Sequence, residues 1–561
     1  RQFKAYGRMS EDDKVKRTIV ELDSDSEGEP SEYSRSFESE EQEEEEECEK
    51  ETCRDLVEDV MIAMKKYKKI EKDYGIPAVQ IEGTYTKESW ACSVNITLAV
   101  GHLPENLRRV WELADNLTIS VIVDLVNKHS FRTNLVRSPV VSARKDNEAT
   151  SRFTVGETLC NAIRPLIKRT FLIERRAPPD EIGSFFELLY ETLLWRLNNL
   201  SEYCMVCGDK LHAGGILPSI CEGDLCTYQY RELNLFDGLA APRVSGDVLA
   251  LLLFSLNAAN NSTRRSSILV PQPSIRDRAL LNDEITHLMP LRAETVPKAE
   301  ENAEEKKKKP VPSDQVLLNQ LNKYLPCPLQ LLSTVSSYYS FRKQYPVAAE
   351  IIEWCVISNR SYLERVPDSL VVPFLETTQQ YLFVSDTPTK QQQFDHLVAA
   401  NGGKTRFLFH GSRAENWHTI IRTGLKNMSG TAFQLNGQVY GKGIYLSPYL
   451  AYSIEYSKEG GIMDRNACSE GGCCLNTNSP LHIVALVEVV DNNEACREAT
   501  PGIVVVKEDK WCAVRMLLIY KNNQVAYTAD LTRLTEQDKK KIRNVVHMFK
   551  TADVLERAKH L

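Results

Sequence analysis

The stretch FLFHGSRAENWHTIIRTGL, residues 407–425, constrains the fold more than any other part of the chain. Its apolar start predicts a strand, and the apolar spacing over AENWHTIIRTGL predicts a helix that ends at Gly424. Ser412 or a neighbour is expected to cap the start of this helix. A strand that ends in His410 and Gly411 therefore places an imidazole, a bare backbone segment and a hydroxyl at one point between a sheet and a helix.

A second glycine-rich stretch, NGQVYGKGIYLSPYLAYSIEYS, adds aromatic rings and hydroxyls. Gly441 and Gly443 lead into a predicted strand with Tyr445, and the next predicted helix carries Ser453 and Tyr456. It is not a dinucleotide-binding fingerprint, because the third glycine is missing, and no Gly-Lys-Ser/Thr closes a phosphate loop. Aromatic faces, backbone amides and hydroxyls are the groups that a nicotinamide and its ribose need. The two stretches together predict a nicotinamide site.

These motifs resemble the catalytic domain of the poly(ADP-ribose) polymerase family, a diphtheria-toxin-like ADP-ribosyltransferase fold. The resemblance is carried by FHGS, NRSYLERVP, ENWHTIIRTGL and GKGIYLSP, and it covers about residues 315–530. It is similar to the mono-ADP-ribosylating branch, which has a long N-terminal region with a cysteine cluster. The resemblance implies split antiparallel β-sheets with flanking helices and a pentosyltransferase that uses NAD⁺ as its co-substrate.

The resemblance also implies roles for the residues on the first stretch. His410 would hydrogen-bond the adenosine ribose of NAD⁺ and count as catalytic. Gly411 would pair the nicotinamide carboxamide through its backbone, and Ser412 would complete this cofactor-binding segment. Taken singly, a histidine like this one is more often a satisfied core residue. The joint spacing with the second stretch favours the site instead.

On the second stretch, the resemblance implies that Tyr445 and Tyr456 enclose the nicotinamide ring and that Ser453 holds its amide. Tyr445 would be the second catalytic residue of the family triad. The polymerising enzymes have a glutamate as the third, near the start of a late strand. The matching position in PGIVVVKEDKWCAVRMLLIY is Ile503. An isoleucine cannot accept a hydrogen bond from a ribose hydroxyl or polarise an incoming one.

Without that glutamate, chain elongation is not expected. The neighbours Gly502 and Val504 are no better bases, and Glu488 lies on another predicted strand. The predicted activity is therefore transfer of one ADP-ribose unit to protein acceptors, including the chain itself. The alternative from another class is a weak or inactive scaffold that binds NAD⁺ or ADP-ribose.

A cysteine cluster predicts a structural metal site. The segment CMVCGDKLHAGGILPSICEGDLC holds Cys204-x2-Cys207 and Cys221-x4-Cys226, spacings that let four thiolates bind one tetrahedral Zn²⁺. Four thiolates leave no position for water or substrate, so the ion would be structural. His212 is a spare candidate ligand. The alternative is four free cysteines in a loop.

The chain is expected to be a multidomain α+β protein, because its composition shifts several times. The strands expected in AVQIEGTY and WACSVNITLAV belong to an α+β domain similar to RWD and ubiquitin-conjugating-enzyme-like domains. VLALLLFSL is expected to be a core segment, and VVPFLETTQQYLFV to be helical. The expected parts are a disordered acidic tail (1–52), the α+β domain (53–200), a four-cysteine zinc-like module (201–235), a mixed connecting region (236–295), a charged linker (296–313), a helical segment (314–404), the catalytic domain (405–534) and a C-terminal helix (535–561).

Charge and cysteine content bear on partners and compartment. The 77 acidic and 69 basic residues give a net charge of -8, so nothing demands a nucleic-acid partner. No apolar run approaches the roughly 20 residues of a membrane span, and no secretory signal pattern opens the sequence. Fifteen cysteines are then expected to be reduced or to bind metal, in a cytoplasmic or nuclear protein. The N-terminal half is expected to bind other proteins.

Overall fold

The computed structural model covers the C-terminal half of the chain most fully. The described residues are a few single positions between 103 and 163 and the ranges 79–85, 90–100, 118–126, 141–143, 192–211, 214–221, 223–232, 244–270, 272–289, 311–430, 439–457, 481–494, 496–521 and 527–551. The expected acidic tail, the spare ligand His212 and most of the charged linker lie outside them.

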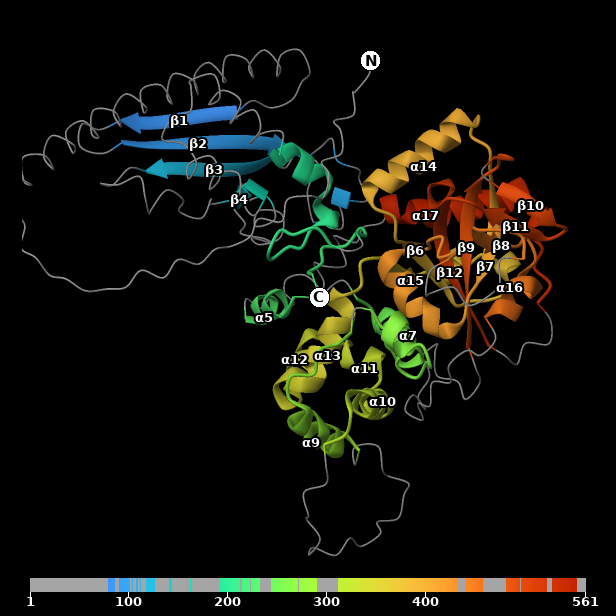
Figure 1. The fold of residues 1–561 in the computed structure, drawn as a ribbon, viewed down its shortest axis with the longest axis horizontal. Coiled ribbons are helices and arrows are strands. Elements are labelled where there is room, and N and C mark those ends of the chain that lie inside the picture. Colours follow the sequence, from blue (N-terminus) through green and yellow to red (C-terminus); the bar gives the residue numbers. More distant parts are fainter. Residues whose placement is uncertain are drawn as a thin grey trace, which may run out of the picture. The chain divides into compact units, whose positions relative to one another are not determined.

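Four strands form an antiparallel sheet in the N-terminal part of the chain (Figure 1). They are β1 (Val79–Tyr85), β2 (Trp90–Ala99), β3 (Thr118–Val126) and β4 (Val141–Ala143), in that order. Their β-branched residues favour a pleated sheet. The two strands expected from the sequence in this region are confirmed, while the likeness to RWD domains stays a prediction.

Helices dominate the next part of the chain. They are η1 (Leu200–Glu202), α5 (Asp224–Glu232), α7 (Gly246–Asn260), α8 (Arg265–Ile268), α9 (Arg278–Leu288), α10 (Asp314–Tyr324), α11 (Pro328–Leu331), α12 (Val335–Gln344) and α13 (Pro346–Ile357). Ser245 caps α7 by accepting a hydrogen bond from the Val248 amide. No helix in the described part of the chain is both long enough and apolar enough to cross a membrane.

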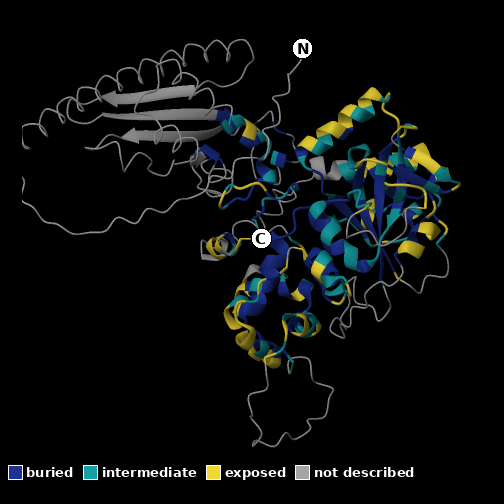
Figure 2. Cartoon of the chain, in the orientation of Figure 1, coloured by how far each residue is buried: buried dark blue, intermediate teal, exposed yellow. Residues whose placement is uncertain are grey.

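Two antiparallel sheets form the C-terminal part, as the resemblance implied. The first has the order β5 (Tyr362–Arg365), β6 (Gln380–Val384), β12 (Cys512–Lys521), β9 (Leu481–Val490) and β7 (Thr405–Gly411). The second has the order β10 (Cys496–Thr500), β11 (Ile503–Val506) and β8 (Ile444–Leu446). The accompanying helices are α14 (Pro388–Ala400), α15 (Trp417–Thr423), α16 (Leu450–Tyr456) and α17 (Glu536–Thr551). Figure 2 shows the central strands buried and α14 largely exposed.

The expectation of a helix over VVPFLETTQQYLFV is wrong. The segment contains a short 3₁₀ turn, η4 (Pro373–Leu375), a left-handed Glu376 and then strand β6. Residues of β6 are buried from Gln380 to Phe383, because neighbouring strands and helices cover both faces. A strand buried on both faces is apolar throughout, so its sequence shows neither the alternation of a half-exposed strand nor a reliable difference from a helix.

Helix α7 packs in the same core as the C-terminal sheets. Its apolar residues, among them Leu251 and Phe254, cluster with Trp417 of α15 and with residues of β6 and β9. The expectation that VLALLLFSL is a core segment is confirmed, since the whole of 248–256 is buried. The sequence predicted a connecting region before residue 296 and a helical segment after residue 313, and this division remains a prediction. Helix α7 lies before residue 296 but packs on strands and helices that lie after residue 313.

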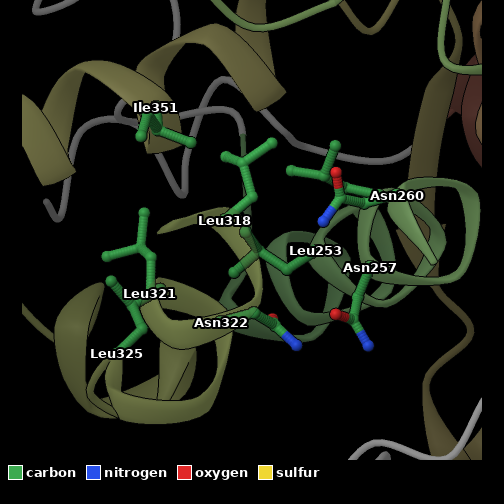
Figure 3. A pocket seen from close by; sticks show the side chains of 9 residues that line it. Leu253, Asn257, Asn260, Leu318, Leu321, Asn322, Leu325 and Ile351 are labelled. Carbon is green, nitrogen blue, oxygen red and sulfur yellow. The ribbon is translucent and has the colours of Figure 1, made fainter. Parts of the chain in front are cut away.

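Asparagines join α7 to α10. The Asn260 amide donates hydrogen bonds to the Gln315 carbonyl at 2.9 Å and to Asn319 Oδ1 at 2.8 Å. Beside this network lies a small pocket, and Figure 3 shows its lining by Leu253 from α7, Leu318 from α10 and Ile351 from α13. The network satisfies polar groups at a helix contact that is otherwise apolar.

Candidate active site

His410 lies near the end of β7 with its ring directed at β8. Its Nδ1 is 2.9 Å from the Tyr445 carbonyl oxygen. A carbonyl can only accept, so Nδ1 carries the proton and Nε2 is left as an acceptor. Burial lowers the pKa of His410 below its ordinary value of 6.5, and the hydrogen bond to Tyr445 offsets part of this effect. The ring is therefore neutral near neutral pH, with the lone pair of Nε2 available to a hydrogen-bond donor.

Gly411 lies against the backbone of α16. A Cβ at this position would come within 1.7 Å of the Ser453 carbonyl oxygen and 2.6 Å of its carbonyl carbon. Glycine is required here because two backbones approach closely. The contact places the buried Ser453 beside the His410-Gly411 segment, and its hydrogen bond to the nicotinamide amide stays a prediction. Tyr456, the last residue of α16, is half-exposed at 48 %.

Tyr445 lies in β8 beneath the glycine loop. Its hydroxyl donates to the Gly441 carbonyl at 2.7 Å and accepts from the Tyr440 amide at 3.1 Å. The loop comes close because Gly443 has no side chain: a Cβ there would meet Val505 Cγ1 at 2.5 Å. The phenol edge is therefore fixed by backbone groups of its own loop.

The two sheets meet next to these residues. Phe409 of β7 and Ser447, just after β8, exchange backbone hydrogen bonds of 2.7 and 2.9 Å. This bridge holds His410 and Tyr445 on neighbouring backbones, although 34 other residues separate them along the chain. The structure thus brings the two stretches of the sequence prediction together. Enclosure of a nicotinamide ring between Tyr445 and Tyr456 stays a prediction.

Ile503 is the first residue of β11. Val505 pairs directly with Tyr445, and side chains two residues apart point to the same face, so Ile503 shares a face with Tyr445. Its place at the start of a late strand matches the position expected from the sequence, while its assignment as the third triad residue stays a prediction. Glu488 is engaged elsewhere, since its carboxylate accepts from Arg515 Nε at 2.8 Å and from the Thr405 hydroxyl at 2.8 Å. Neither residue puts a carboxylate beside Tyr445.

Ser412 does not cap the helix after it, contrary to the sequence expectation. The short 3₁₀ helix η5 (Ala414–Asn416) comes first, and the N-cap of α15 is Asn416, without a side-chain cap hydrogen bond. Ser412 instead accepts a hydrogen bond from Asn416 Nδ2 at 2.9 Å through its hydroxyl and one from Trp417 Nε1 at 3.1 Å through its carbonyl. Trp417 also packs edge-on against the His410 ring, with centroids 6.5 Å apart. Both residues belong to the quoted motif ENWHTIIRTGL, but their contacts with Ser412 and His410 were not predicted from the sequence.

The four cysteines of the predicted metal site lie together. The sulfur atoms of Cys204, Cys207, Cys221 and Cys226 are all within 4.8 Å of one another. Four thiolates bound to one Zn²⁺ at about 2.3 Å would be about 3.8 Å apart. Backbone amides point at two of the sulfurs: the Cys221 amide is 3.1 Å from Cys204 Sγ, and the Asp209 amide is 3.5 Å from Cys207 Sγ. The arrangement fits a structural zinc ion.

The loop between the two cysteine pairs contacts the residue that leads into β5. The backbone amides of Ile216 and Leu217 donate to the Arg360 carbonyl at 2.8 and 3.2 Å. On its other side, the Ile216 carbonyl accepts from the indole of Trp111 at 3.2 Å. The cysteine module therefore joins an N-terminal segment to the edge of the five-stranded sheet.

The part of the chain that contains the candidate site is similar to known proteins. Residues 376–513 match the family model for the poly(ADP-ribose) polymerase catalytic domain. The proteins named protein mono-ADP-ribosyltransferase PARP8 from Homo sapiens and from Mus musculus are each 29% identical to the chain over 366 residues, which cover 59% of this chain. A putative poly [ADP-ribose] polymerase-like protein 100L of Invertebrate iridescent virus 6 is 41% identical over 69 residues, 12% of this chain and 38% of that protein.

The matched segment includes His410, Tyr445 and Ile503, so the candidate site lies in a region similar to an ADP-ribosyltransferase catalytic domain. Residues 376–513 are similar to the poly(ADP-ribose) polymerase catalytic domain, and the mammalian relatives are named as mono-ADP-ribosyltransferases, which confirms the resemblance seen in the motifs. The aligned part of the chain spans 38% of the length of the mammalian relatives.

Proposed function

We propose that the chain is an NAD⁺-dependent protein mono-ADP-ribosyltransferase that modifies protein side chains, its own included, and releases nicotinamide. The observation that carries the proposal is the 2.9 Å contact between His410 Nδ1 and the Tyr445 carbonyl, which unites the two family motifs at one place. Relatives named as mono-ADP-ribosyltransferases support the same reaction.

The reaction needs little acid or base chemistry from the protein. The nicotinamide–ribose bond is activated by the positive charge of the ring, so the bonding pair leaves with neutral nicotinamide. The acceptor then forms the new bond to the ribose C1′. A carboxylate or thiolate acceptor has no proton to lose, whereas a hydroxyl or amine acceptor gives its proton to a base. His410 would hold the adenosine ribose and Tyr445 the nicotinamide, which fixes the dinucleotide in a strained, dehydrated conformation.

Ile503 supports single transfer over elongation. Polymer growth requires an acceptor hydroxyl of ADP-ribose to be polarised, and an isoleucine side chain has no group for that task. A protein carboxylate or a thiolate is already a nucleophile and attacks without such help. Serine or lysine acceptors would need another base. We therefore favour carboxylate or thiolate acceptors.

Labelled NAD⁺ tests the proposal. The wild-type chain is expected to gain single ADP-ribose units, resolved by gel and by mass. His410→Ala and Tyr445→Ala are each expected to reduce labelling at least about 100-fold, because each removes a group that orients the reacting dinucleotide. His396→Ala, at an exposed position on α14, is the matched control and should label like wild type.

Other outcomes have distinct meanings. Thermal protection by NAD⁺ without any labelling would favour the alternative, a scaffold that binds NAD⁺ or ADP-ribose. A ladder of long polymer would show that position 503 does not decide elongation.

We also propose that Cys204, Cys207, Cys221 and Cys226 hold one structural Zn²⁺. Purified wild-type protein is then expected to contain about one zinc per chain by elemental analysis. Cys204→Ser should lose the ion and lower the melting temperature, because a structural metal contributes folding free energy. Cys327→Ser, a buried cysteine outside the cluster, should keep it. Wild-type protein without zinc, prepared without chelator, would contradict the proposal.

We also propose that the acceptors are proteins and that the N-terminal half of the chain binds other proteins. The cytoplasmic or nuclear location expected from the cysteine content stays a prediction.

A further inference from the structure

The Ser412 hydroxyl has a defined direction of hydrogen bonding. It accepts from Asn416 Nδ2 at 2.9 Å. An amide nitrogen can only donate, so the hydroxyl proton must point elsewhere, and a hydroxyl has just one proton to give. Ser412 directly follows His410-Gly411, so this proton is available to an acceptor other than Asn416 next to the proposed NAD⁺ site.

The Asn416 amide is oriented by an arginine far away in the sequence. Arg264 Nη2 donates to Asn416 Oδ1 at 2.7 Å, which forces the oxygen of the amide toward Arg264 and its nitrogen toward Ser412. If the Asn416 amide were flipped, its NH₂ group would face the NH₂ group of Arg264, and neither could accept. The hydrogen bond from Asn416 to Ser412 would also be lost. The guanidinium therefore decides which way the Ser412 hydroxyl donates.

Arg264 is itself fixed. Its Nε and Nη2 donate to Glu415 Oε1 at 3.2 and 2.5 Å, and both side chains are largely buried, 19 % and 18 % exposed. Burial would raise the pKa of Glu415, but hydrogen bonds from Ser262 and Arg264 outweigh it and lower the pKa below the ordinary value. The carboxylate thus stays ionised and anchors the guanidinium.

The segment that contains Arg264 is hydrogen-bonded to α15, the helix whose N-cap residue is Asn416. Arg264 lies in the turn between α7 and α8, and the Thr419 hydroxyl on α15 donates to the Ile268 carbonyl at 2.8 Å. Helix α7 also packs on η5 and on α15. The turn therefore has a fixed position relative to Ser412.

We propose that Arg264 is a positioning residue for the adenosine-ribose side of the NAD⁺ site, and that it acts by orienting Asn416 so that the Ser412 hydroxyl donates to the ribose. The inference rests on the proposed function, because it needs NAD⁺ to occupy this site. It assigns a role in that site to a residue before the charged linker.

Asn416→Asp is the most selective test. An aspartate keeps the pairing with Arg264 but can only accept hydrogen bonds. The Ser412 hydroxyl then donates to the new carboxylate and can no longer donate to the ribose. Aspartate is also a good N-cap residue, so the melting temperature should not fall. The KM for NAD⁺ is expected to rise about tenfold, the effect of one lost hydrogen bond, while kcat stays within about twofold. Calorimetry should give the same change in Kd.

A double-mutant cycle separates positioning from general damage. Ser412→Ala removes the donor itself and should raise the KM by a similar factor, and adding Asn416→Asp to it should change nothing further. Arg264→Gln should raise the KM in the wild-type background and have little effect on the KM beside Ser412→Ala. Arg276→Gln, an exposed arginine paired with Glu350, is the control and should leave the KM unchanged.

The outcomes are distinguishable. Additive effects in the cycle, or an Asn416→Asp variant that binds NAD⁺ like wild type, would overturn the inference. Failure of the wild-type chain to bind NAD⁺ would instead overturn the proposed function on which it rests.

Discussion

A chain that starts at residue 314 is expected not to fold, whereas a chain that starts at residue 244 is expected to fold and bind NAD⁺. The shorter chain lacks α7, which supplies Val248, Leu251, Leu252 and Phe254 to the core shared with the C-terminal sheets. Burial of four such side chains stabilises by about 6–12 kcal/mol, at about 1.5–3 kcal/mol each. Because a whole domain is stable by only about 5–15 kcal/mol, this loss removes most or all of the stability.

Circular dichroism, thermal melting and NAD⁺ binding would check this expectation. A third chain that starts at residue 192 restores the cysteine module and controls for its contact with Arg360. If the chain from residue 314 melted cooperatively and bound NAD⁺ as tightly as the chain from residue 244, α7 would be only an attachment to the core.

Gly411→Ala is expected to abolish NAD⁺ binding and labelling. The new methyl group would lie 1.7 Å from the Ser453 carbonyl oxygen, and both partners are backbone, so no side chain can rotate away. Either the end of β7 or helix α16 must move, and α16 carries Ser453 and Tyr456. Overpacking of this kind costs about 1–3 kcal/mol, so the melting temperature should also fall by several degrees.

Gly403→Ala provides the comparison for a loss of stability alone. Its φ of +75° is unfavourable for alanine, but nothing lies within 4 Å of the added methyl group. It should lower the melting temperature by a similar amount, since the strain is about 1 kcal/mol or more, and leave NAD⁺ binding intact. Unchanged NAD⁺ affinity in Gly411→Ala would show that the backbone contact with α16 is not needed for the site.

The sequence predicted features that depend on local pattern. The strand that ends in His410 and Gly411, the strand with Tyr445 and the gathering of the four cysteines all follow from residue types at short spacing. In each case neighbouring residues alone decide the outcome, through alternation, glycine position or ligand geometry. The strand register that places Ile503 on the same face as Tyr445 was not predicted, because it depends on the pairing of β11 with β8.

Features that depend on distant packing were missed. Arg264 and Asn416 are 152 positions apart, and only the packing of α7 on η5 brings them together. The strand β6 was expected to be helical because both of its faces are buried and its residues are apolar without alternation. Ser412 was expected to be a helix cap because the sequence cannot show that the η5 turn precedes α15.

Helix α7 contributes to the core through its side chains, so the core does not require an unbroken chain between α9 and α10. Helix α9 ends at Leu288 and α10 begins at Asp314, and Arg278 of α9 pairs with Asp314 through contacts of 2.5 and 3.2 Å. The residues that complete the core are thus supplied by two pieces, one before residue 290 and one after residue 310, that already contact each other. Such a topology suits fragment complementation: a short helical peptide supplied in trans would restore a split transferase, so that the NAD⁺ site forms only when both pieces are present.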